Sequence, residues 1–515
     1  MIKIENNTEK KATYLPYEPK MEPSPPDKLN FKRTIIISLA FFTVLMAWSY
    51  FNFKVPLLLN EVLMEELGRD NALITLLIGS IMAMDNIVAV ILQPFFGDLS
   101  DRTKSKFGRR MPYIILGTAS SAFFFTLLPL VRIIAGLVII ILLFDVAMSI
   151  YRSAAIAILP DYTSDKMYSK ASAVQQFIAN IGGLLGFAMP MIFPATLFSK
   201  PTPVQEFLIN FGDLFGMDLA YIVPSSILGD LLPFLAIAII MVLLLIIQNI
   251  FLKETPTGEK FIKISENRLD IEPTTFKARE LKAGFEAAEA PKRKKYSSYG
   301  EAFRIMRGHR DFAFFLGTVI FMYLAFASVE SFFSLFAQEY LGATEAQASR
   351  LFLFYSGPMI AVAYIVGLLG QSKKVGRKNA VKIFLIWLII SLFIMTFIIV
   401  PSLYQKHNEL IMIIMLVLIS VPWMGFIVNS FPILWELAPE GDLGIYTGIY
   451  YTFNQSAYAL APILFGGLLS AFSTLFAKGF KYIIMFPFIF ACVIVALLLF
   501  FKVRGGEAKP MESEK

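Results

Sequence analysis

Five ionisable residues lie within long apolar stretches of the sequence and are the first candidates for chemistry: Lys54, Asp85, Asp145, Arg152 and Glu330. A charge at bilayer depth costs about 2.5–3.5 kcal/mol even on lenient insertion scales, so each one needs a partner or a function. A carboxyl group sealed from water keeps its proton and releases it beside water or a cation. We therefore expect proton-coupling sites at Asp145, Asp85 and Glu330.

Asp145 and Arg152 are seven residues apart, which places them on one face of a helix, about 10.5 Å apart along its axis. This separation is too long for a direct bond, so a substrate hydroxyl or a neighbour such as Asp85 is expected between them. Two alternatives stay open. Asp145 is either a proton site or part of a structural ion pair, and Asp85 either takes part in cation coupling or neutralises Lys54 or Arg152.

A sugar site also needs rings that stack on C–H faces and amides that bond to hydroxyls. The candidates on helical stretches are Trp48, Tyr50, Asn52, Gln176, Asn180, Tyr323, Tyr451, Asn454 and Gln455. The predicted substrate-binding set consists of these residues without Tyr50 and Tyr323, together with Arg152, Lys54 and Glu339. Two interpretations of Lys54 remain: it neutralises Glu330 or Glu339, or it binds an anionic substrate such as a hexuronide.

The elements that must position these residues are membrane spans. The 515 residues are 57% hydrophobic and 17% charged, a balance that a water-soluble globule cannot bury. Twelve apolar runs have the length of about 20 residues that crosses a bilayer core. They cover residues 34–58, 71–98, 112–130, 133–158, 170–194, 228–252, 311–338, 346–371, 379–400, 409–437, 446–471 and 479–502. We expect an all-α integral membrane protein with 12 transmembrane helices in two six-helix bundles, multi-pass in the cell membrane and monomeric.

Lys and Arg are distributed unevenly between the two sides. The segments on the side of both termini carry 36 of them, and the opposite loops carry 6. The positive-inside rule therefore predicts cytoplasmic termini and explains the net charge of +7 without a nucleic-acid partner. The expected organisation is a cytoplasmic tail (1–33), a bundle (34–252), a cytoplasmic linker (253–310), a second bundle (311–502) and a cytoplasmic tail (503–515). The outer loop at 195–227 is expected to form an amphipathic cover.

Several classes of chemistry are disfavoured. One Cys, Cys492, and two His argue against a disulfide framework and a histidine-built metal site, and the lack of any Gly-Lys pair argues against a Walker-type phosphate loop. No cofactor is expected. A membrane enzyme would need an interfacial cluster of His, Cys or paired acids, whereas the cytoplasmic loops offer only PDYTSD (160–165) and WELAPEGD (435–442), which are typical of helix ends. We therefore expect no enzymatic activity.

A basic loop occurs twice: GDLSDRTKSKFGRR follows the second predicted span, and GQSKKVGRK follows the eighth. Such parallel repeats are typical of two-bundle transporters. In the first loop Gly97 permits close helix approach, Asp101 caps or pairs with another helix, and the arginines hold carboxylates at the cytoplasmic ends. The predicted cytoplasmic gate consists of Gly97, Asp101, Arg102, Gly108, Arg109 and Arg110. The alternative is that these basic residues only keep the loop inside.

The stretch from Gln93 to Ile114 resembles the loop between helices two and three of the sucrose/proton symporters and of the related glycoside-pentoside-hexuronide:cation symporters, within the major facilitator superfamily. It departs from the family pattern once, at Met111. Three further stretches are similar to family segments: GGLLGFA (182–188), FAQEYLG (336–342) and GIYTGIYYTFNQ (444–455).

The resemblance implies that Asp145 aligns with a protonatable Asp of the sucrose symporters. Their Arg on the same helix falls at Ile156, one turn after Arg152. In the superfamily, the loop that corresponds to 97–110 resembles a latch that stabilises the outward-facing state. Melibiose permease, a cousin, has sodium-binding Asp residues where this chain has Ala89 and Gln93, which favours protons over sodium as the coupling ion.

These observations predict a secondary active transporter, with proton-coupled symport of a sugar or glycoside such as a sucrose- or maltose-like disaccharide by alternating access. Three alternatives remain open. They are a proton-coupled exporter of sugars or small amphiphiles, a hexuronide symporter in which Lys54 meets the anion, and a nutrient receptor that senses without transporting.

Overall fold

The computed structural model describes residues 29–68, 71–163, 165–194, 225–252, 307–372, 375–406, 408–439, 443–476 and 479–506. Within these ranges every regular element is a helix. Eleven helices are long and apolar enough to span a membrane, and a twelfth, α6, is as long but more polar. The predicted all-helical, multi-pass membrane fold is therefore confirmed. The predicted amphipathic loop, linker and terminal tails lie almost wholly outside the described residues.

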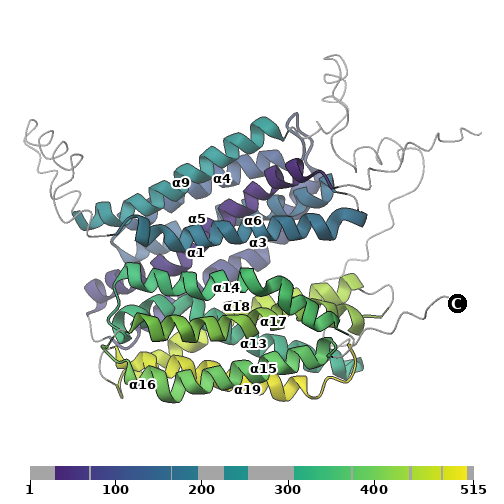
Figure 1. The fold of residues 1–515 in the computed structure, drawn as a ribbon. Coiled ribbons are helices and arrows are strands. Elements are labelled where there is room, and N and C mark those ends of the chain that lie inside the picture. The colour runs from purple at the N-terminus through teal and green to yellow at the C-terminus, as the bar shows by residue number, and fades with distance from the viewer. Residues whose placement is uncertain are drawn as a thin grey trace, which may run out of the picture.

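The first half of the chain contributes α1 (Phe31–Leu67), α2 (Ile74–Met82), α3 (Met84–Arg102), α4 (Met111–Leu127), α5 (Ile134–Tyr162), α6 (Asp165–Ile192) and α9 (Ser225–Phe251). The second half contributes α13 (Arg310–Leu335), α14 (Glu345–Gln371), α15 (Arg377–Ile394), α16 (Val400–Ser402), α17 (Glu409–Leu437), α18 (Leu443–Phe472) and α19 (Met485–Phe500). The second predicted span is thus divided into α2 and α3 at Ala83. The helices of each half gather on their own side of the molecule (Figure 1).

Glycines let helices within the first half pack backbone to backbone. Gly182 and Gly186 on α6 face α1, where an added Cβ would lie 2.1 Å from the Phe42 carbonyl oxygen and 2.3 Å from that of Met46. Their spacing is the small-xxx-small pattern that brings membrane helices together. Since lipid tails are as apolar as the helices themselves, such close contact is a main source of packing energy in a bilayer.

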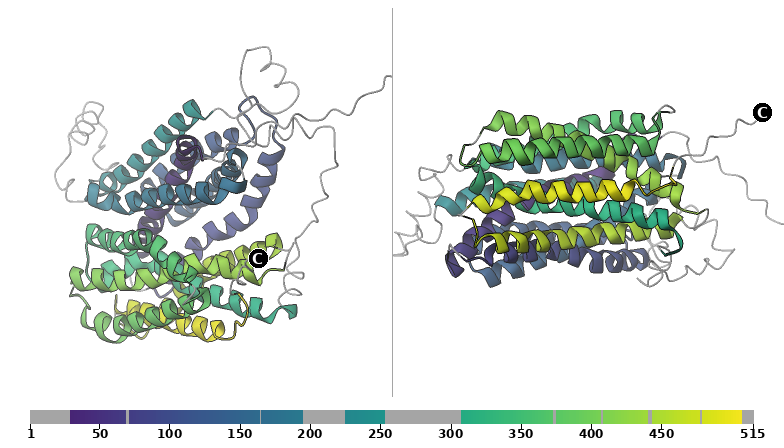
Figure 2. Two further views of the ribbon diagram at one scale, coloured as in Figure 1. Left: turned by 45° about the vertical axis from the view of Figure 1, so that its right-hand side comes forward. Right: turned by 90° about the horizontal axis from the view of Figure 1, so that it is seen from below.

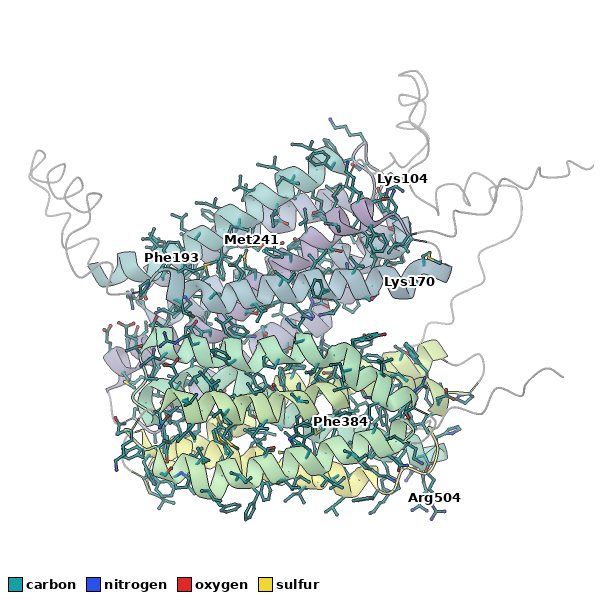
Figure 3. The ribbon with its side chains drawn as sticks, in the orientation of Figure 1. Lys104, Lys170, Phe193, Met241, Phe384 and Arg504 are labelled. Carbon is teal, nitrogen blue, oxygen red and sulfur yellow. The ribbon has the colours of Figure 1, made fainter. Side chains whose placement is uncertain are left out.

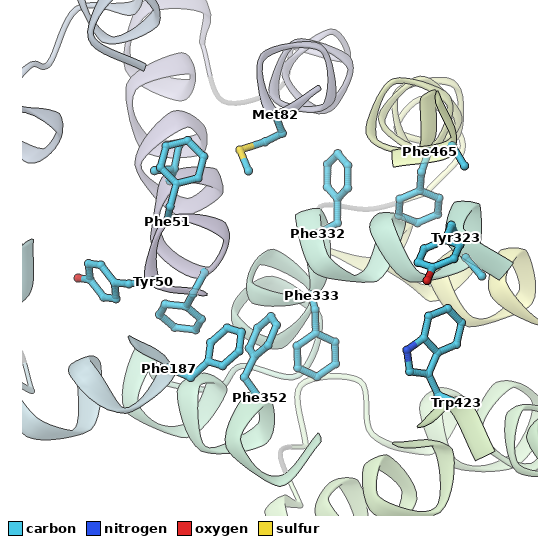
Figure 4. Packing of buried hydrophobic residues seen from close by; sticks show 14 of the residues in the cluster. Tyr50, Phe51, Met82, Phe187, Tyr323, Phe332, Phe333, Phe352, Trp423 and Phe465 are labelled. Atoms are coloured by element: carbon cyan, nitrogen blue, oxygen red, sulfur yellow. The ribbon is translucent and has the colours of Figure 1, made fainter. Parts of the chain in front are cut away.

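The same device joins the two halves. An added Cβ at Gly79 of α2 would lie 2.0 Å from the Pro462 carbonyl oxygen of α18, and one at Gly466 would lie 2.4 Å from that of Thr75. On another pair of helices, α6 meets α14 through stacked rings of Phe187 and Phe352, whose centroids are 4.7 Å apart (Figure 4). These contacts close one end of the interface between the halves, which we call the sealed end.

The opposite end carries Lys104, Lys170 and Arg504, and there the two halves diverge (Figure 3). The divergence is also plain after a turn of the molecule (Figure 2, left). We call this the basic end. An added Cβ at Gly97 on α3 or at Gly448 on α18 would meet nothing within 4 Å. The close helix approach expected at Gly97 is therefore not made in this conformation.

The predicted loop repeat corresponds to a shared backbone turn. Gly108 precedes α4 with φ +89°, and Gly376 precedes α15 with φ +73°. Both values are in the left-handed region that favours glycine. Each glycine is followed by basic residues at the start of a helix, which supports an internal repeat of the two halves.

A Gly186→Val substitution should loosen the contact between α1 and α6, because its side chain would press on a backbone carbonyl that has no room to move. Overpacking of this kind typically costs about 1–3 kcal/mol. We expect the midpoint of thermal unfolding in detergent to fall by several degrees. Gly357→Ala is the control, since an added Cβ at Gly357 meets nothing within 4 Å. An equal fall in both variants would contradict this packing.

Candidate functional site

A cavity of about 530 Å³ lies between the halves, near the middle of the helices. Its walls come from α1, α2, α3, α5 and α6 on one side and from α13, α14 and α18 on the other. The structure brings ten predicted site residues together there: Trp48, Asn52, Asp85, Arg152, Gln176, Asn180, Glu330, Tyr451, Asn454 and Gln455. Tyr323, from the wider list of aromatic candidates, also lines it. Its volume is within the range of about 300–1,000 Å³ that is usual for small-molecule sites.

The charges in the cavity come from three helices and act on one another. Arg152 of α5 interacts electrostatically with Asp85 of α3 and with Glu330 of α13. Asp85 Oδ1 accepts from the backbone N–H of Asn86 at 2.5 Å and from the side-chain amide of the same residue. Glu330 Oε1 accepts from Asn52 Nδ2 at 2.7 Å. One guanidinium, with five N–H donors, thus acts on two carboxylates at the wall of the cavity.

The second half contributes a tyrosine wall, which we define as Tyr323, Tyr355, Tyr451 and Tyr458. The rings of Tyr323 and Tyr458 are 5.4 Å apart. Sequence reasoning missed Tyr355 and Tyr458. Tyr458 continues the stripe of Tyr451 and Gln455 along one face of α18, a spacing of four and then three residues that would have found it.

The aromatic candidate Tyr50 does not reach the cavity. It is buried at 1% exposure, and its ring lies 4.8 Å from Phe234 and 6.3 Å from Phe125. It is a packing residue of the first half.

Asp145 lies behind the cavity wall and does not line it. It is 2% exposed, and within the described part of the chain neither carboxylate oxygen has a hydrogen-bond partner. The charge that acts on it is that of Asp85. The alternative is that Asp145 forms an ion pair that fixes α5 to a neighbouring helix. Among the described residues no cation bonds to Asp145.

Lys54 pairs differently from the prediction. Its Nζ lies 2.6 Å from Asp230 Oδ1 on α9 and 2.5 Å from Glu345 Oε1 on α14. The predicted pairing with Glu330 or Glu339 is wrong, since those glutamates accept from Asn52 and Asn60 of α1 instead. Residues two positions apart do not share a helix face, so Lys54 points away from the cavity that Asn52 lines.

A second pocket, also of about 530 Å³, lies at the sealed end and is lined by Lys54 and Glu339 among others. These two members of the predicted substrate set are therefore separated by the closed interface from the other eight, which line the central cavity.

The predicted gate residues gather around a carboxylate that sequence reasoning placed only in a helix-end motif. Asp161 Oδ1 is 2.5 Å from Arg109 Nη2, and its Oδ2 is 3.1 Å from Arg110 Nε. Arg110 also donates to Asp101 Oδ1 and to the Ser100 hydroxyl. Arg102 does not join this group, because it pairs with the exposed Asp98 on the same helix. In the second half Arg377 pairs with Glu436 at 3.3 Å, the counterpart of Arg109 and Asp161.

Two groups of membrane-spanning helices with a polar cavity between them are the architecture of a secondary transporter. The Major Facilitator Superfamily model matches residues 37–462 of the sequence. The chain belongs to this superfamily of membrane transporters. No curated protein matches it significantly in sequence.

Solved structures share the fold across nearly the whole chain. A bacterial homologue of the human lysosomal transporter Spinster, in an inward-facing and unoccupied conformation, superposes with a TM-score of 0.64 at 13% identity, over 95% of this chain and all of that one. A D-xylose-proton symporter gives a TM-score of 0.61 at 14% identity, over 91% and 97%. The nucleoside transporter NupG gives 0.59 at 11%, over 92% and 100%. At these identities the likeness shows the fold alone.

Asp161→Asn should destabilise the basic end, because two arginines would lose the charge of a buried carboxylate. Removing one partner of such a group costs about 3–5 kcal/mol, whereas an exposed pair one helical turn apart contributes about 0.5 kcal/mol. We expect a clear fall in the thermal unfolding midpoint for Asp161→Asn and almost none for Asp98→Asn. Similar midpoints in the two variants would show that the Asp161 cluster does not stabilise the fold.

Proposed function

We propose that the protein is a proton-coupled sugar symporter that works by alternating access between the two halves. The observation that carries the proposal is the central cavity, which combines one guanidinium, two carboxylates, several amides and a tyrosine wall. Hydroxyl groups of a sugar need donors and acceptors in about equal measure, and its C–H faces need rings.

The basic end is proposed to face the cytoplasm, following the positive-inside rule. Gln176 and Tyr451 lie on the part of the cavity toward this end and are exposed, Tyr451 at 50%. The cavity is then open to the cytoplasm and closed to the outside by Phe187 and Phe352. The described conformation corresponds to an inward-facing step of the cycle.

We propose that the carboxyl groups of Asp145 and Asp85 couple proton movement to sugar transport. Burying an ionised carboxylate without a donor or a cation is costly, so Asp145 is assigned a bound proton in this conformation. Asp85, which lines the cavity beside Arg152, then exchanges protons between Asp145 and water. Glu330 is the third carboxyl group of the set and lies on the opposite half. Its hydrogen bond to Asn52 links the ligand space to the contact between α1 and α13.

A neutral glycoside is favoured over a hexuronide. Lys54 is already held by two carboxylates outside the cavity, and Arg152 faces two more within it. An anionic sugar would meet more negative than positive groups there. The names of the D-xylose-proton symporter and of the nucleoside transporter NupG give two different substrate classes, so their likeness does not guide the choice of sugar.

The test is uptake of labelled sucrose and maltose into proteoliposomes with an inside-negative, inside-alkaline gradient. Asp145→Asn should lower the accumulated sugar at least tenfold. Sugar exchange without a gradient should survive, because only the proton site is lost. Arg152→Lys should weaken both accumulation and exchange, since a lysine cannot supply the planar fork of donors. Asp98→Asn, an exposed change of the same type, should leave both unchanged.

Collapse of uptake by a protonophore in the unmodified protein completes the expected pattern. Lack of uptake of any glycoside, or accumulation that persists in Asp145→Asn, would refute the proton-sugar proposal.

A further inference from the structure

Helix α1 offers three donor side chains to the second half at the sealed end, and each is bonded to a glutamate. The pairs are Asn52 with Glu330 at 2.7 Å, Lys54 with Glu345 at 2.5 Å, and Asn60 with Glu339 at 2.7 Å. We call these three pairs the outer seam. All the donors come from the first half, and all the acceptors come from α13, the π-helical turn that follows it, and α14.

We infer that the outer seam is the gate of the sealed end, with Lys54 as its one charged donor and Glu345 as the partner that must leave for this end to open. The inference deepens the proposed transport function, since it assigns the residues whose separation admits substrate from the outside.

The charges around Lys54 are arranged so that the gate can open without leaving a buried charge alone. Asp230 belongs to the same half as Lys54 and keeps its own bond at 2.6 Å when Glu345 departs. Arg132 holds the other oxygen of Asp230 at 3.2 Å and reaches Glu61 at 2.8 Å, both also in the first half. The side chain of Glu345 is 36% exposed already and passes easily into water.

The backbone around two of the acceptors, Glu345 and Glu339, is held in place by local hydrogen bonds. Glu345 occupies the first turn of α14, where Thr344 and Gln347 form a capping box. Glu339 lies in the π-helical turn Phe336–Tyr340, a feature that is frequent at functional sites. Its carbonyl oxygen accepts from Gln405 Nε2 at 2.8 Å, which fixes that turn to the rest of the second half.

Glu330 connects the seam to the cavity, because the same carboxylate lines the ligand space and bonds to Asn52. A ligand hydroxyl or a proton that reaches Glu330 competes with Asn52 for its oxygens. Occupancy of the cavity therefore weakens the innermost pair of the seam first.

A matched ion pair lies at the same end but within one half. Arg350 of α14 bonds to Glu409 of α17 through two hydrogen bonds, at 2.5 Å and 3.0 Å. Its loss removes an ion pair on the same helix as Glu345. The side chain of Glu409 has an exposure comparable with that of Glu345 (26% against 36%), and both partners of the pair belong to the second half. Glu409→Gln is therefore the control.

The experiment measures access to the cavity from outside in the absence of sugar. In a Cys492→Ser background, Ser356→Cys places a reporter thiol on the cavity wall. A membrane-impermeant maleimide is then added to the outer face of intact cells. Losing one charged hydrogen bond changes the equilibrium between the closed and the open sealed end by about tenfold. We expect Glu345→Gln to raise the labelling rate about tenfold, Glu339→Gln to raise it less, and Glu409→Gln to leave it unchanged.

Unchanged labelling in both Glu345→Gln and Glu339→Gln would overturn the gate, and so would an equal rise in Glu409→Gln. Thermal unfolding of each variant in detergent identifies a rise caused by general loosening, which would also count against the gate. Since the assay contains no sugar and no gradient, its failure is distinct from a failure of proton-coupled sugar uptake.

Discussion

The cost of placing charge within a membrane-spanning bundle governs the arrangement of this transporter. The ionisable groups deep in the helices avoid the lipid and gather where the two halves meet, either around the cavity or at the sealed end. There the charges act on opposite charges: Arg152 interacts with two carboxylates, and Lys54 is held by two more. Asp145 is the exception, because it is buried and its carboxylate oxygens have no hydrogen-bond partner among the described residues; for this reason the proposed coupling assigns it the proton.

Packing supplies the complementary constraint. Close backbone contacts at Gly79 and Gly466, together with the ring stack of Phe187 and Phe352, hold the two halves together at the sealed end, much as Gly186 holds α6 to α1 within the first half. The basic end lacks such contacts between α3 and α18. The halves therefore behave as two stiff bodies in contact at one end, and the cavity is the space that this geometry leaves at the middle of the bilayer.

Much of the fold followed from the sequence because hydropathy reports membrane helices directly. The twelve predicted runs agree with the observed helices to within a few residues at most ends, although α1 continues to Leu67, nine residues beyond its predicted end, and α2 and α3 form two segments. The cavity residues were found because polar groups are rare in apolar runs.

The ion-pair partners of Lys54 could not be predicted from the sequence. Lys54 and Asn52 point to different sides of one helix, and Asp230 lies on a helix far away in sequence. Tyr355 and Tyr458 were missed because 50 Phe and 20 Tyr make single rings uninformative.

The tyrosine wall belongs wholly to the second half, whereas Asp85, Arg152 and Asp145 belong to the first. The two halves therefore contribute unequally to the site: the second supplies the tyrosine rings, and the first supplies the guanidinium and two of the three buried carboxyl groups. Under the proposed function, substitutions in the wall would change which compounds are transported and would leave the carboxyl groups of the first half in place. Such a division would give protein engineers a surface in one half on which to change the transported compound while the charged groups of the other half keep their contacts.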